Sequence, residues 1–542
     1  MSFAVYFNSL NNDFVFDDQT LIVDNPVIKS SEFLSRIFKK NLYDYPGMAN
    51  EITSDQMYRP LQSLTYSIDY RIWGLRPLGF RLANILLHLI NSILIYYLLI
   101  TIFENNALSK IISVLFLVHP IHTSVVSYIS GRADLLVRLF MFLSMICFLE
   151  FIKSGSKVYY TFSLLSALFA LLSRENALTL FVFLTLILFI IKAKPKYYFH
   201  IMPFILLDLF YLILRFFLLG HSGILIHTPL LSLPLRIVTF FNILLEYLLI
   251  LLLPLDLHLF RSIPFIRDLL EARTFFALIF ILFYFLGVVR LRKNKLFVFS
   301  MLWFLIAIIP VFLYMDSFPV LNEAMMAESW VYIASLGFFI LLAYILKSVR
   351  KTGGIIIASL TVFYAFLTIA NNKYWKNEFV LYEYMLGYAP KAIPMRKNLI
   401  YAYLENGLDK KAISEINKFT TYAPDSPDLD MFWGGYFLLI GRPLLAIDKY
   451  SVSLSKNPKN FYAYYNLTSC YKELGQLDRA INCALQCFEI KPYHFLNLIR
   501  LGDLYSEKKQ FSEGLKYYLR AYEIDPSDKM PREKIKKCKA NI

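Results

Sequence analysis

The sequence has few charged residues and few cysteines for its length. Aspartate, glutamate, lysine and arginine make up 18% of its 542 residues, while hydrophobic residues make up 57%. A soluble chain has about 25% charged residues and about 45–50% apolar ones, so a single soluble globule is excluded. The five cysteines form no CxxC pair, so neither a zinc site nor a disulfide framework is indicated. No GxSxG, P-loop or GxGxxG motif supports soluble-type hydrolase or nucleotide chemistry.

What the sequence has instead is a series of long apolar runs. Each run is long enough, or nearly so, to cross a hydrocarbon core of about 30 Å as a helix. The runs predict an all-α fold, a polytopic transmembrane bundle of about 10–12 spans. Eleven are found, near residues 80–103, 110–129, 135–152, 157–173, 177–192, 198–219, 233–253, 274–290, 296–314, 330–349 and 353–371.

Basic residues in four short connectors predict the orientation of this bundle. Lysine and arginine favour cytoplasmic loops, which puts the polar loop 11–79, the loop at Gly131 and the C-terminal region outside. This arrangement needs an even number of crossings between residues 80 and 372, so one of the eleven runs is not a simple span. We expect a re-entrant or interfacial segment around 198–253. The basic residues concerned are Lys153, Lys157, Lys192, Lys194, Lys196, Arg290, Arg292, Lys293, Lys295, Lys347, Arg350 and Lys351.

The formal net charge is +15, from 55 basic and 40 acidic residues. In a chain of this composition, positive-inside loops and affinity for anionic head groups explain the excess better than nucleic acid does. We therefore expect contact with membrane lipid and no nucleic-acid partner.

Residues 1–10 read like the last turns of a membrane helix whose start is absent. The segment is too short to span a membrane, and it lacks the basic n-region of a signal peptide. We expect that the true start lies upstream, or that the gene model is truncated.

A different periodicity begins near Lys373. Residues of three kinds recur every 34 positions, which resembles the tetratricopeptide repeat (TPR), an α-solenoid of stacked helix pairs. The sequence thus predicts a membrane domain over 1–372 and a TPR domain over 373–542. The recurring residues are Pro390, Pro424, Pro458, Pro492 and Pro526, then Gly407, Gly441 and Gly475, and finally Ala412, Ala446, Ala480 and Gly514.

Two adjacent aspartates, Asp17 and Asp18, follow the N-terminal apolar segment. Adjacent carboxylates beside a membrane helix can serve as a general base and as a metal or substrate ligand, because their repulsion separates their pKa values. The alternative is a solvated turn, since aspartate and asparagine favour turns.

Histidines and arginines recur at the outward rim predicted above. Fixed positive charge there suits a phosphate leaving group. The candidates are Arg59, His119, His122, Arg132 and Arg174, with Asp134, Glu175 and Glu328 as supporting acidic residues.

Other interpretations of these residues remain open. Arg132 and Asp134 can simply pair with each other. His119 and His122 are two ligands without a third, so no metal site is assigned. His88, alone in an apolar run, is better explained as a core histidine that is hydrogen-bonded within the bundle.

These motifs together resemble one family. The acidic pair with Asn25-Pro26, Tyr58-Arg59-Pro60-Leu61, His119-Pro120-Ile121-His122-Thr123, Gly131-Arg132-Ala133-Asp134-Leu135-Leu136 and the C-terminal repeats occur in the order seen in the transmembrane and TPR repeat-containing O-mannosyltransferases (TMTC group). The resemblance implies a GT-C glycosyltransferase that uses a sugar on polyprenyl phosphate. It implies that Asp17 and Asp18 are the catalytic acidic motif, and that the repeats present a protein acceptor on the same side of the membrane.

The chain departs from that family at one position. The family tends to have arginine after the glutamate that corresponds to Glu328, where this chain has Ser329. If that arginine holds the donor phosphate, another cation must replace it.

The sequence therefore predicts an inverting membrane-embedded hexosyltransferase. It would move a sugar, mannose by resemblance, from a polyprenyl-phosphate donor to serine or threonine hydroxyls of an extracytoplasmic protein, in a prokaryotic plasma membrane. A divalent cation at the acidic motif is compatible with this reaction, although no ligand spacing indicates one. The alternatives are an O-antigen ligase or polymerase and a non-catalytic membrane-anchored TPR scaffold.

Overall fold

The computed structural model describes residues 1–542 except 31–33, 35, 36, 39–56, 220–230, 260, 269, 316–322 and 527. About a third of the expected outward loop 11–79, and residues 316–322 of the connector 315–329, therefore lie outside the described residues. The chain divides into two compact units. Unit 1 comprises Met1–Asp18, Tyr58–Thr65 and Ile72–Asn377, and unit 2 comprises Gln19–Met57, Tyr66–Arg71 and Glu378–Ile542.

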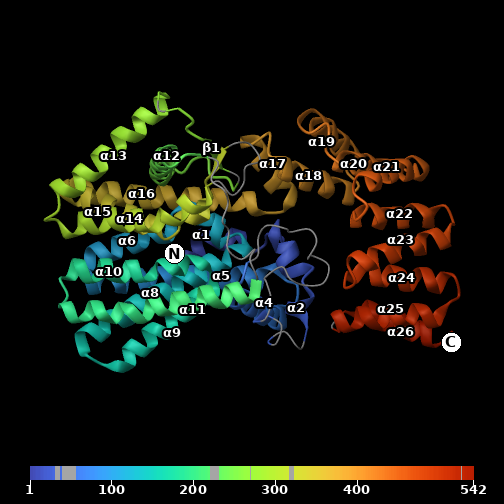
Figure 1. Ribbon diagram of the computed structural model, residues 1–542, viewed down its shortest axis with the longest axis horizontal. Coiled ribbons are helices and arrows are strands. Elements are labelled where there is room, and N and C mark those ends of the chain that lie inside the picture. The colour runs from blue at the N-terminus through green and yellow to red at the C-terminus, as the bar shows by residue number, and fades with distance from the viewer. Residues whose placement is uncertain are drawn as a thin grey trace. The chain divides into compact units, whose positions relative to one another are not determined.

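Unit 1 is a bundle of apolar helices (Figure 1). Seven helical segments in the described residues are long and apolar enough to cross a membrane, and a bent pair adds an eighth. Three shorter apolar helices bring the total to eleven, and each corresponds to one of the apolar runs of the sequence. The main helices are α1 (Ser2–Tyr6), α5 (Pro77–Phe103), α6 (Asn106–Val118), α8 (Arg132–Ser154), α9 (Lys157–Ser173), α10 (Leu180–Ile191), α11 (Met202–Leu219), α12 (Leu233–Leu252), α13 (Ala272–Arg290), α14 (Lys295–Tyr314), α15 (Ala334–Ser348) and α16 (Arg350–Asn371).

One candidate span of unit 1 is a bent helix pair, outside the range 198–253. Helices α11 and α12 are each continuous, and the expectation of a re-entrant or interfacial segment around 198–253 stays a prediction. The bend lies between α6 and the segment Pro120–Val126, which contains the short helices Pro120–His122 and α7 (Thr123–Val126). The two parts meet at an angle of 51°. Pro120 explains the break, because proline has no N–H and disfavours helical geometry at the residue before it.

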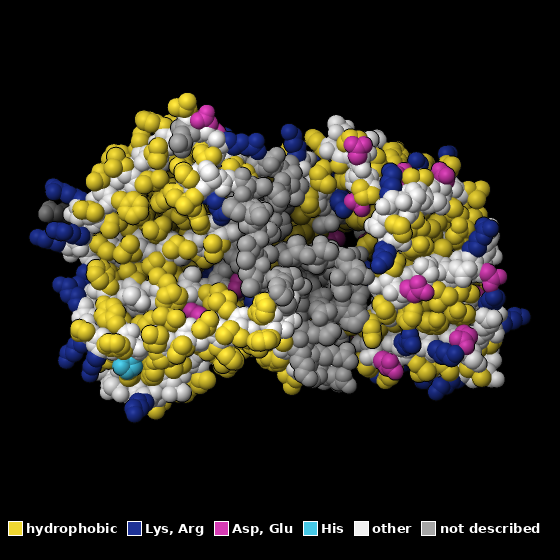
Figure 2. Space-filling model, viewed as in Figure 1, with side chains coloured by type: hydrophobic (Ala, Val, Ile, Leu, Met, Phe, Trp, Pro, Cys, Tyr) yellow, Lys and Arg dark blue, Asp and Glu magenta, His cyan; other side chains and the backbone are white. Residues whose placement is uncertain are grey.

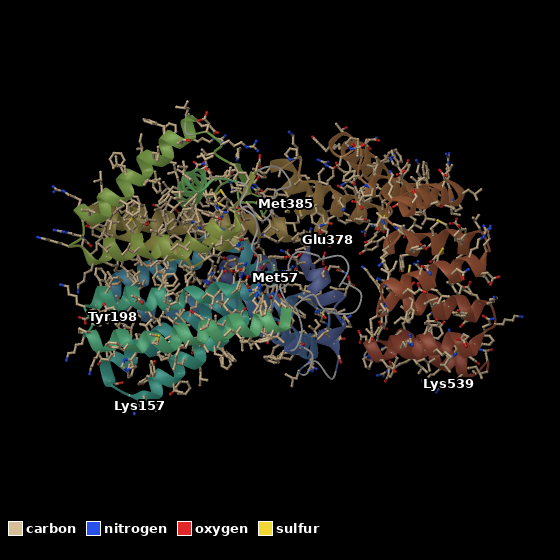
Figure 3. All side chains as sticks on the ribbon, in the orientation of Figure 1. Met57, Lys157, Tyr198, Glu378, Met385 and Lys539 are labelled. Carbon is tan, nitrogen blue, oxygen red and sulfur yellow. The ribbon has the colours of Figure 1, made fainter. Side chains whose placement is uncertain are left out.

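Two of the basic connectors lie at one end of unit 1. Figure 3 places Lys157 and Tyr198 at that end, and Figure 2 shows lysine and arginine gathered there beside an apolar flank. The Tyr160 hydroxyl donates to the His200 carbonyl at 3.0 Å, and the Tyr197 hydroxyl donates to the Ile152 carbonyl at 3.1 Å. A shared basic end is what the positive-inside pattern requires of these connectors.

A small strand pair joins two loops of unit 1. Strand β1 (Ser262–Pro264) pairs antiparallel with β2 (Glu323–Met325), and Ile263 lies opposite Ala324. This pairing brings the connector after α12 next to the loop that carries Glu328.

The C-terminal part of unit 2 is a series of helix pairs that follow one another along the chain (Figure 1). Gly407, Gly441 and Gly475 sit between paired helices at φ of +71°, +71° and +72°, where a residue with a side chain is strained. Ala412, Ala446 and Ala480 are fully buried. The helices are α17 (Glu378–Tyr388), α18 (Ile393–Glu405), α19 (Asp409–Tyr422), α20 (Asp428–Leu439), α21 (Pro443–Lys456), α22 (Phe461–Glu473), α23 (Leu477–Ile490), α24 (Phe495–Glu507), α25 (Phe511–Ile524) and α26 (Lys529–Lys539).

The 34-residue period therefore has a structural cause. Its glycines make the turns within helix pairs, and its small residues lie where helices pack closely. A Cβ at Gly514, for example, would lie 2.9 Å from the Gly502 carbonyl oxygen. The all-α fold predicted from the sequence is confirmed.

Candidate functional site

The two adjacent aspartates have different environments. Asp18 is fully buried, and its carboxylate accepts hydrogen bonds from the backbone N–H of Val15 at 3.1 Å and from both the N–H and the hydroxyl of Ser130 at 2.8 and 2.5 Å. Burial raises the pKa of Asp18 to about 6, against the lowering effect of these hydrogen bonds. Asp17 is only partly buried and accepts a hydrogen bond from the Tyr128 hydroxyl at 2.7 Å. Asp17 is therefore the more accessible carboxylate of the two, and Asp18 connects the acidic loop to the turn at Ser130.

The backbone around the pair is held by a buried arginine that we did not predict. Arg81, on α5, donates to the carbonyl oxygens of Asn12 and Asp13, and to that of Ser127 at 3.0 Å. An ionisable residue within an apolar run was the sequence signal for it. Because Arg81 holds both the acidic loop and the turn at Ser127, it sets the position of one against the other.

Helix α4 (Pro60–Trp73) begins beside this turn. Gln62 donates to the carbonyl oxygen of Ser130 at 3.1 Å, the residue that also binds Asp18. Arg59, just before the helix, forms an ion pair with Glu175 through Nη2 and Oε1 at 2.8 Å, and its Nε lies 3.4 Å from Oε2. The predicted residues Arg59 and Glu175 are thus brought to the same region as the acidic pair.

A second ion pair joins two more of the predicted residues. Asp134 pairs with Arg174, and Arg138 approaches it at 4.0 Å. Arg215, on α11, lies within electrostatic range of Glu175. Arg138 and Arg215 were missed, although both stand out as charges inside apolar runs.

Taken together, this arginine network is positively charged. Four arginines (Arg59, Arg138, Arg174 and Arg215) surround two carboxylates (Asp134 and Glu175), so positive charge exceeds negative charge by two. Such an excess is suited to a phosphate group, for which the planar guanidinium offers paired donors.

Arg132 makes contacts inside the bundle. Its Nε donates to Oδ1 of Asn84 at 2.8 Å and its Nη2 donates to the Phe80 carbonyl at 2.7 Å. The side chain is 1% exposed. Arg132 therefore anchors the turn that carries Ser130.

The histidines form a buried aromatic cluster. His119 uses both ring nitrogens, with Nε2 donating to the Leu251 carbonyl at 2.9 Å and Nδ1 accepting from the Ile121 N–H at 3.2 Å. His122 packs against Phe116 and Tyr332, with ring centroids 4.4 and 4.7 Å away, and within the described part of the chain neither of its nitrogens has a hydrogen-bond partner.

His88 lies in the same cluster. Its Nδ1 is 2.8 Å from the Tyr332 hydroxyl and its Nε2 is 3.1 Å from the Leu117 carbonyl. The interpretation of His88 as a hydrogen-bonded core histidine is confirmed. Among the described residues no group of three histidine, cysteine, aspartate or glutamate side chains could hold a metal ion.

Glu328 belongs to a separate polar group beside the β1–β2 pair. It is buried and accepts a hydrogen bond from the His258 N–H at 2.6 Å. Burial raises the pKa of Glu328 to about 8, and the nearby charge of Arg261 opposes this rise. Arg261 also pairs with Asp256 at 3.2 Å. A cation from another loop is thus present near Glu328, where the sequence has Ser329 instead of arginine.

Comparison with known proteins supports the resemblance found in the motifs. The tetratricopeptide repeat family matches residues 449–482 and 497–528. Protein O-mannosyl-transferase TMTC3 of Homo sapiens is 26% identical over 96% of this chain and 63% of that protein. Protein O-mannosyl-transferase F38B6.6 of Caenorhabditis elegans is 26% identical over 76% of this chain and 60% of that protein. The crystal structure of MamA protein aligns with 27% of this chain and 81% of its own, at 26% identity and a TM-score of 0.23.

The resemblance to the TMTC proteins is therefore confirmed at the family level, and the chain ends in tetratricopeptide repeats. The apolar helices, together with this similarity, identify an integral membrane protein. The chain spans about 60% of the length of these two relatives.

Proposed function

For this membrane chain, similar over most of its length to protein O-mannosyl-transferases, we propose a hexosyltransferase activity toward protein. Residues 1–372 form the transferase domain and residues 373–542 form the TPR domain. The donor is mannose on a polyprenyl phosphate, and the acceptor is a serine or threonine hydroxyl of an extracytoplasmic protein. The observation that carries the proposal is the partly exposed Asp17 on a turn that Gln62 and Ser130 link to the arginine network.

The reaction is a single displacement with inversion. Asp17 takes the proton from the acceptor hydroxyl, whose oxygen attacks the anomeric carbon of the sugar. The bond from that carbon to the phosphate oxygen breaks, and the polyprenyl phosphate leaves with the bonding electrons. The phosphate gains negative charge as it leaves, and the fixed guanidinium groups of Arg59 and Arg174 stabilise it.

Asp18 acts by positioning the acidic loop. Its hydrogen bonds to Val15 and Ser130 tie the acidic loop to the turn that also carries Tyr128. Tyr128 in turn orients the Asp17 carboxylate by donating a hydrogen bond to one of its oxygens. A base held in one orientation needs no reorganisation before the proton transfer.

The test is transfer of label from polyprenyl-phosphate mannose to protein in membranes that contain the full chain. The Asp17→Asn variant should lose the activity, because an amide cannot accept the proton. Asp13→Asn is the matched control, since Asp13 lies in the same loop with an exposed side chain. Unchanged transfer in the Asp17→Asn variant would refute the assignment. If no label enters protein with the wild type or with either variant, mannose on polyprenyl phosphate is contradicted as the donor. Other lipid-linked sugars would then be tested.

A further inference from the structure

A short 3-10 helix, η10 (Asn372–Trp375), follows α16 and comes just before the helix pairs of the repeats. The proposed reaction uses none of its residues. It belongs to unit 1, as does the acidic loop. Asn372 is fully buried and Trp375 is 5% exposed, so both side chains pack against other segments of the chain. These segments are the N-terminal residues and the turn that carries Tyr128.

Asn372 fixes η10 against three of these segments. Its Nδ2 donates to the Val5 carbonyl at 2.8 Å and to Oδ1 of Asn8 at 2.7 Å. Its Oδ1 accepts from the Ser127 hydroxyl at 2.7 Å, and its carbonyl oxygen accepts from Nδ2 of Asn12 at 3.0 Å. A buried amide whose oxygen and nitrogen are both hydrogen-bonded has one defined orientation. Helix η10 is therefore held in a fixed place beside the acidic loop.

The ring of Trp375 stacks on the ring of Tyr128. The two ring centroids are 5.1 Å apart, and the ring planes are inclined by 22°. Tyr128 is 7% exposed, and its hydroxyl donates to Oδ2 of Asp17 at 2.7 Å. The carbonyl oxygen of the next residue, Lys376, accepts a hydrogen bond from the Asp13 N–H at 2.8 Å. The end of η10 thus contacts both the tyrosine that binds Asp17 and the loop that carries Asp17.

Stacking restricts the rotation that would carry the Tyr128 hydroxyl away from Asp17. A tyrosine side chain turns about two bonds between staggered rotamers, and only some of these bring its hydroxyl to a given partner. An offset-stacked aromatic pair is favourable beyond the area that it buries, so the Trp375 ring stabilises one rotamer of Tyr128. In that rotamer the hydroxyl reaches Asp17. The orientation of the base matters, because a misplacement of about 1 Å can cost about a hundredfold in rate.

We propose that Trp375 is a positioning residue for Asp17 and acts through the ring of Tyr128. Its stacking keeps the Tyr128 hydroxyl on Asp17, which holds that carboxylate in the orientation that accepts the proton. Asn372 holds the short helix that carries Trp375. The proposal rests on the proposed function in one respect, since it takes Asp17 to be the base.

Transfer kinetics of the full chain in membranes test this proposal as a double-mutant cycle. Trp375→Leu removes the stacked ring and Tyr128→Phe removes the hydroxyl, and we expect each change to lower kcat about tenfold. Both changes break the same chain of contacts, so the double variant should also fall about tenfold and not about a hundredfold. KM for polyprenyl-phosphate mannose should stay unchanged, because the proposed donor phosphate is held by Arg59 and Arg174.

Three further variants separate positioning from packing. Trp375→Phe keeps an aromatic face against Tyr128 and should retain most of the wild-type kcat. Trp375→Met fills the buried volume without an aromatic ring and should be as slow as Trp375→Leu. Trp73→Leu is the matched control, since it removes a tryptophan that is 37% exposed at the end of α4, and it should have wild-type kinetics. Independent effects in the double variant, or a Trp375→Phe variant as slow as Trp375→Leu, would overturn the proposal.

A second measurement needs no sugar transfer. Carboxylates of the purified full chain in detergent are coupled to an amine with a carbodiimide, and mass spectrometry gives the rate at each residue. Loss of the Tyr128 hydrogen bond should raise the rate at Asp17 about threefold in both Trp375→Leu and Tyr128→Phe. The rate at the exposed Glu473 should stay the same.

Equal rates at Asp17 in wild type and in Trp375→Leu would overturn the proposal. Thermal unfolding midpoints identify any variant that is not folded, and Trp375→Met then takes the place of Trp375→Leu. The expected change at Asp17 in a chain that transfers no sugar would refute the transferase and leave the positioning of Asp17 by Trp375 intact.

Discussion

Ser130 donates two hydrogen bonds to one carboxylate oxygen of Asp18, from its backbone N–H at 2.8 Å and from its hydroxyl at 2.5 Å. The two residues are 112 positions apart in the chain. This pairing connects the acidic loop to the start of α8, and it gives different environments to two adjacent aspartates that look equivalent in the sequence.

Replacing Ser130 tests the contribution of its hydroxyl to this pairing with Asp18. Ser130→Ala removes one of the three donors to a buried carboxylate, and we expect it to destabilise the protein by about 1–3 kcal/mol. The measurement is the midpoint of thermal unfolding of the purified protein in detergent. Ser154→Ala is the control, because the Ser154 hydroxyl bonds only within its own helix end, to Glu150 and to the N–H of Ser156. A shift no larger than that of the control would show that the hydrogen bond from the Ser130 hydroxyl to Asp18 contributes little to stability.

Ion pairing at the arginine network gives a second prediction. Arg59→Gln leaves Glu175 buried beside the site and removes a cation, so we expect transfer to fall about tenfold to a hundredfold, mainly through weaker donor binding. Arg59→Lys keeps the charge but loses the two N–H donors, on Nε and Nη2, that face the two oxygens of Glu175. It should therefore retain only part of the activity. Initial rates against donor concentration measure both. Lys157→Gln, at the basic end of unit 1, should have wild-type kinetics; full activity in Arg59→Gln would exclude Arg59 from donor binding.

Stability should depend on pH through Glu328. Burial raises the pKa of Glu328 to about 8 in the folded protein, above the value of about 4.3 in an unfolded chain. Between these values the folded state holds more protons than the unfolded state, so the free energy of unfolding falls as the pH rises from about 4.5 to about 8.

Glu328→Gln removes this titration. Its unfolding midpoint should vary less over that pH window than the wild-type midpoint does. The exposed Glu473→Gln change is the control and should leave the wild-type pH dependence unaltered. A Glu328→Gln profile parallel to wild type would contradict the raised pKa.

The glycines of the repeats can be ranked by substitution. Gly441→Ala, at φ of +71° with open space around the new methyl group, should cost about 1 kcal/mol through backbone strain alone. Gly434→Ala should cost more, because its Cβ would lie 2.6 Å from the Tyr450 ring. Gly387→Ala, at an exposed position of helix α17, meets no atom within 4 Å and should be neutral or stabilising. Chemical unfolding of the three variants gives the order, and equal effects would contradict it.

The sequence by itself determined the architecture of this protein. Hydropathy over some twenty residues is a local property, so the apolar runs located the helices of unit 1. The 34-residue period located the helix pairs, because glycine and alanine recur where turns and close packing require them. The motifs around Asp17 and Gly131 also predicted a candidate site, and that assignment stays a prediction.

Only the tertiary structure decided the burial and the contact partners of the polar residues. Burial of Asp18 and partial exposure of Asp17 depend on Ser130 and Tyr128, which are distant in sequence. Asp134 pairs with Arg174, and Arg132 with Asn84, although Arg132 and Asp134 are near neighbours in the chain. The bend at Pro120 is accompanied by full burial of His119 and His122, whose contacts come from distant helices. Long-range packing chooses among partners of similar chemistry, and no local pattern records that choice.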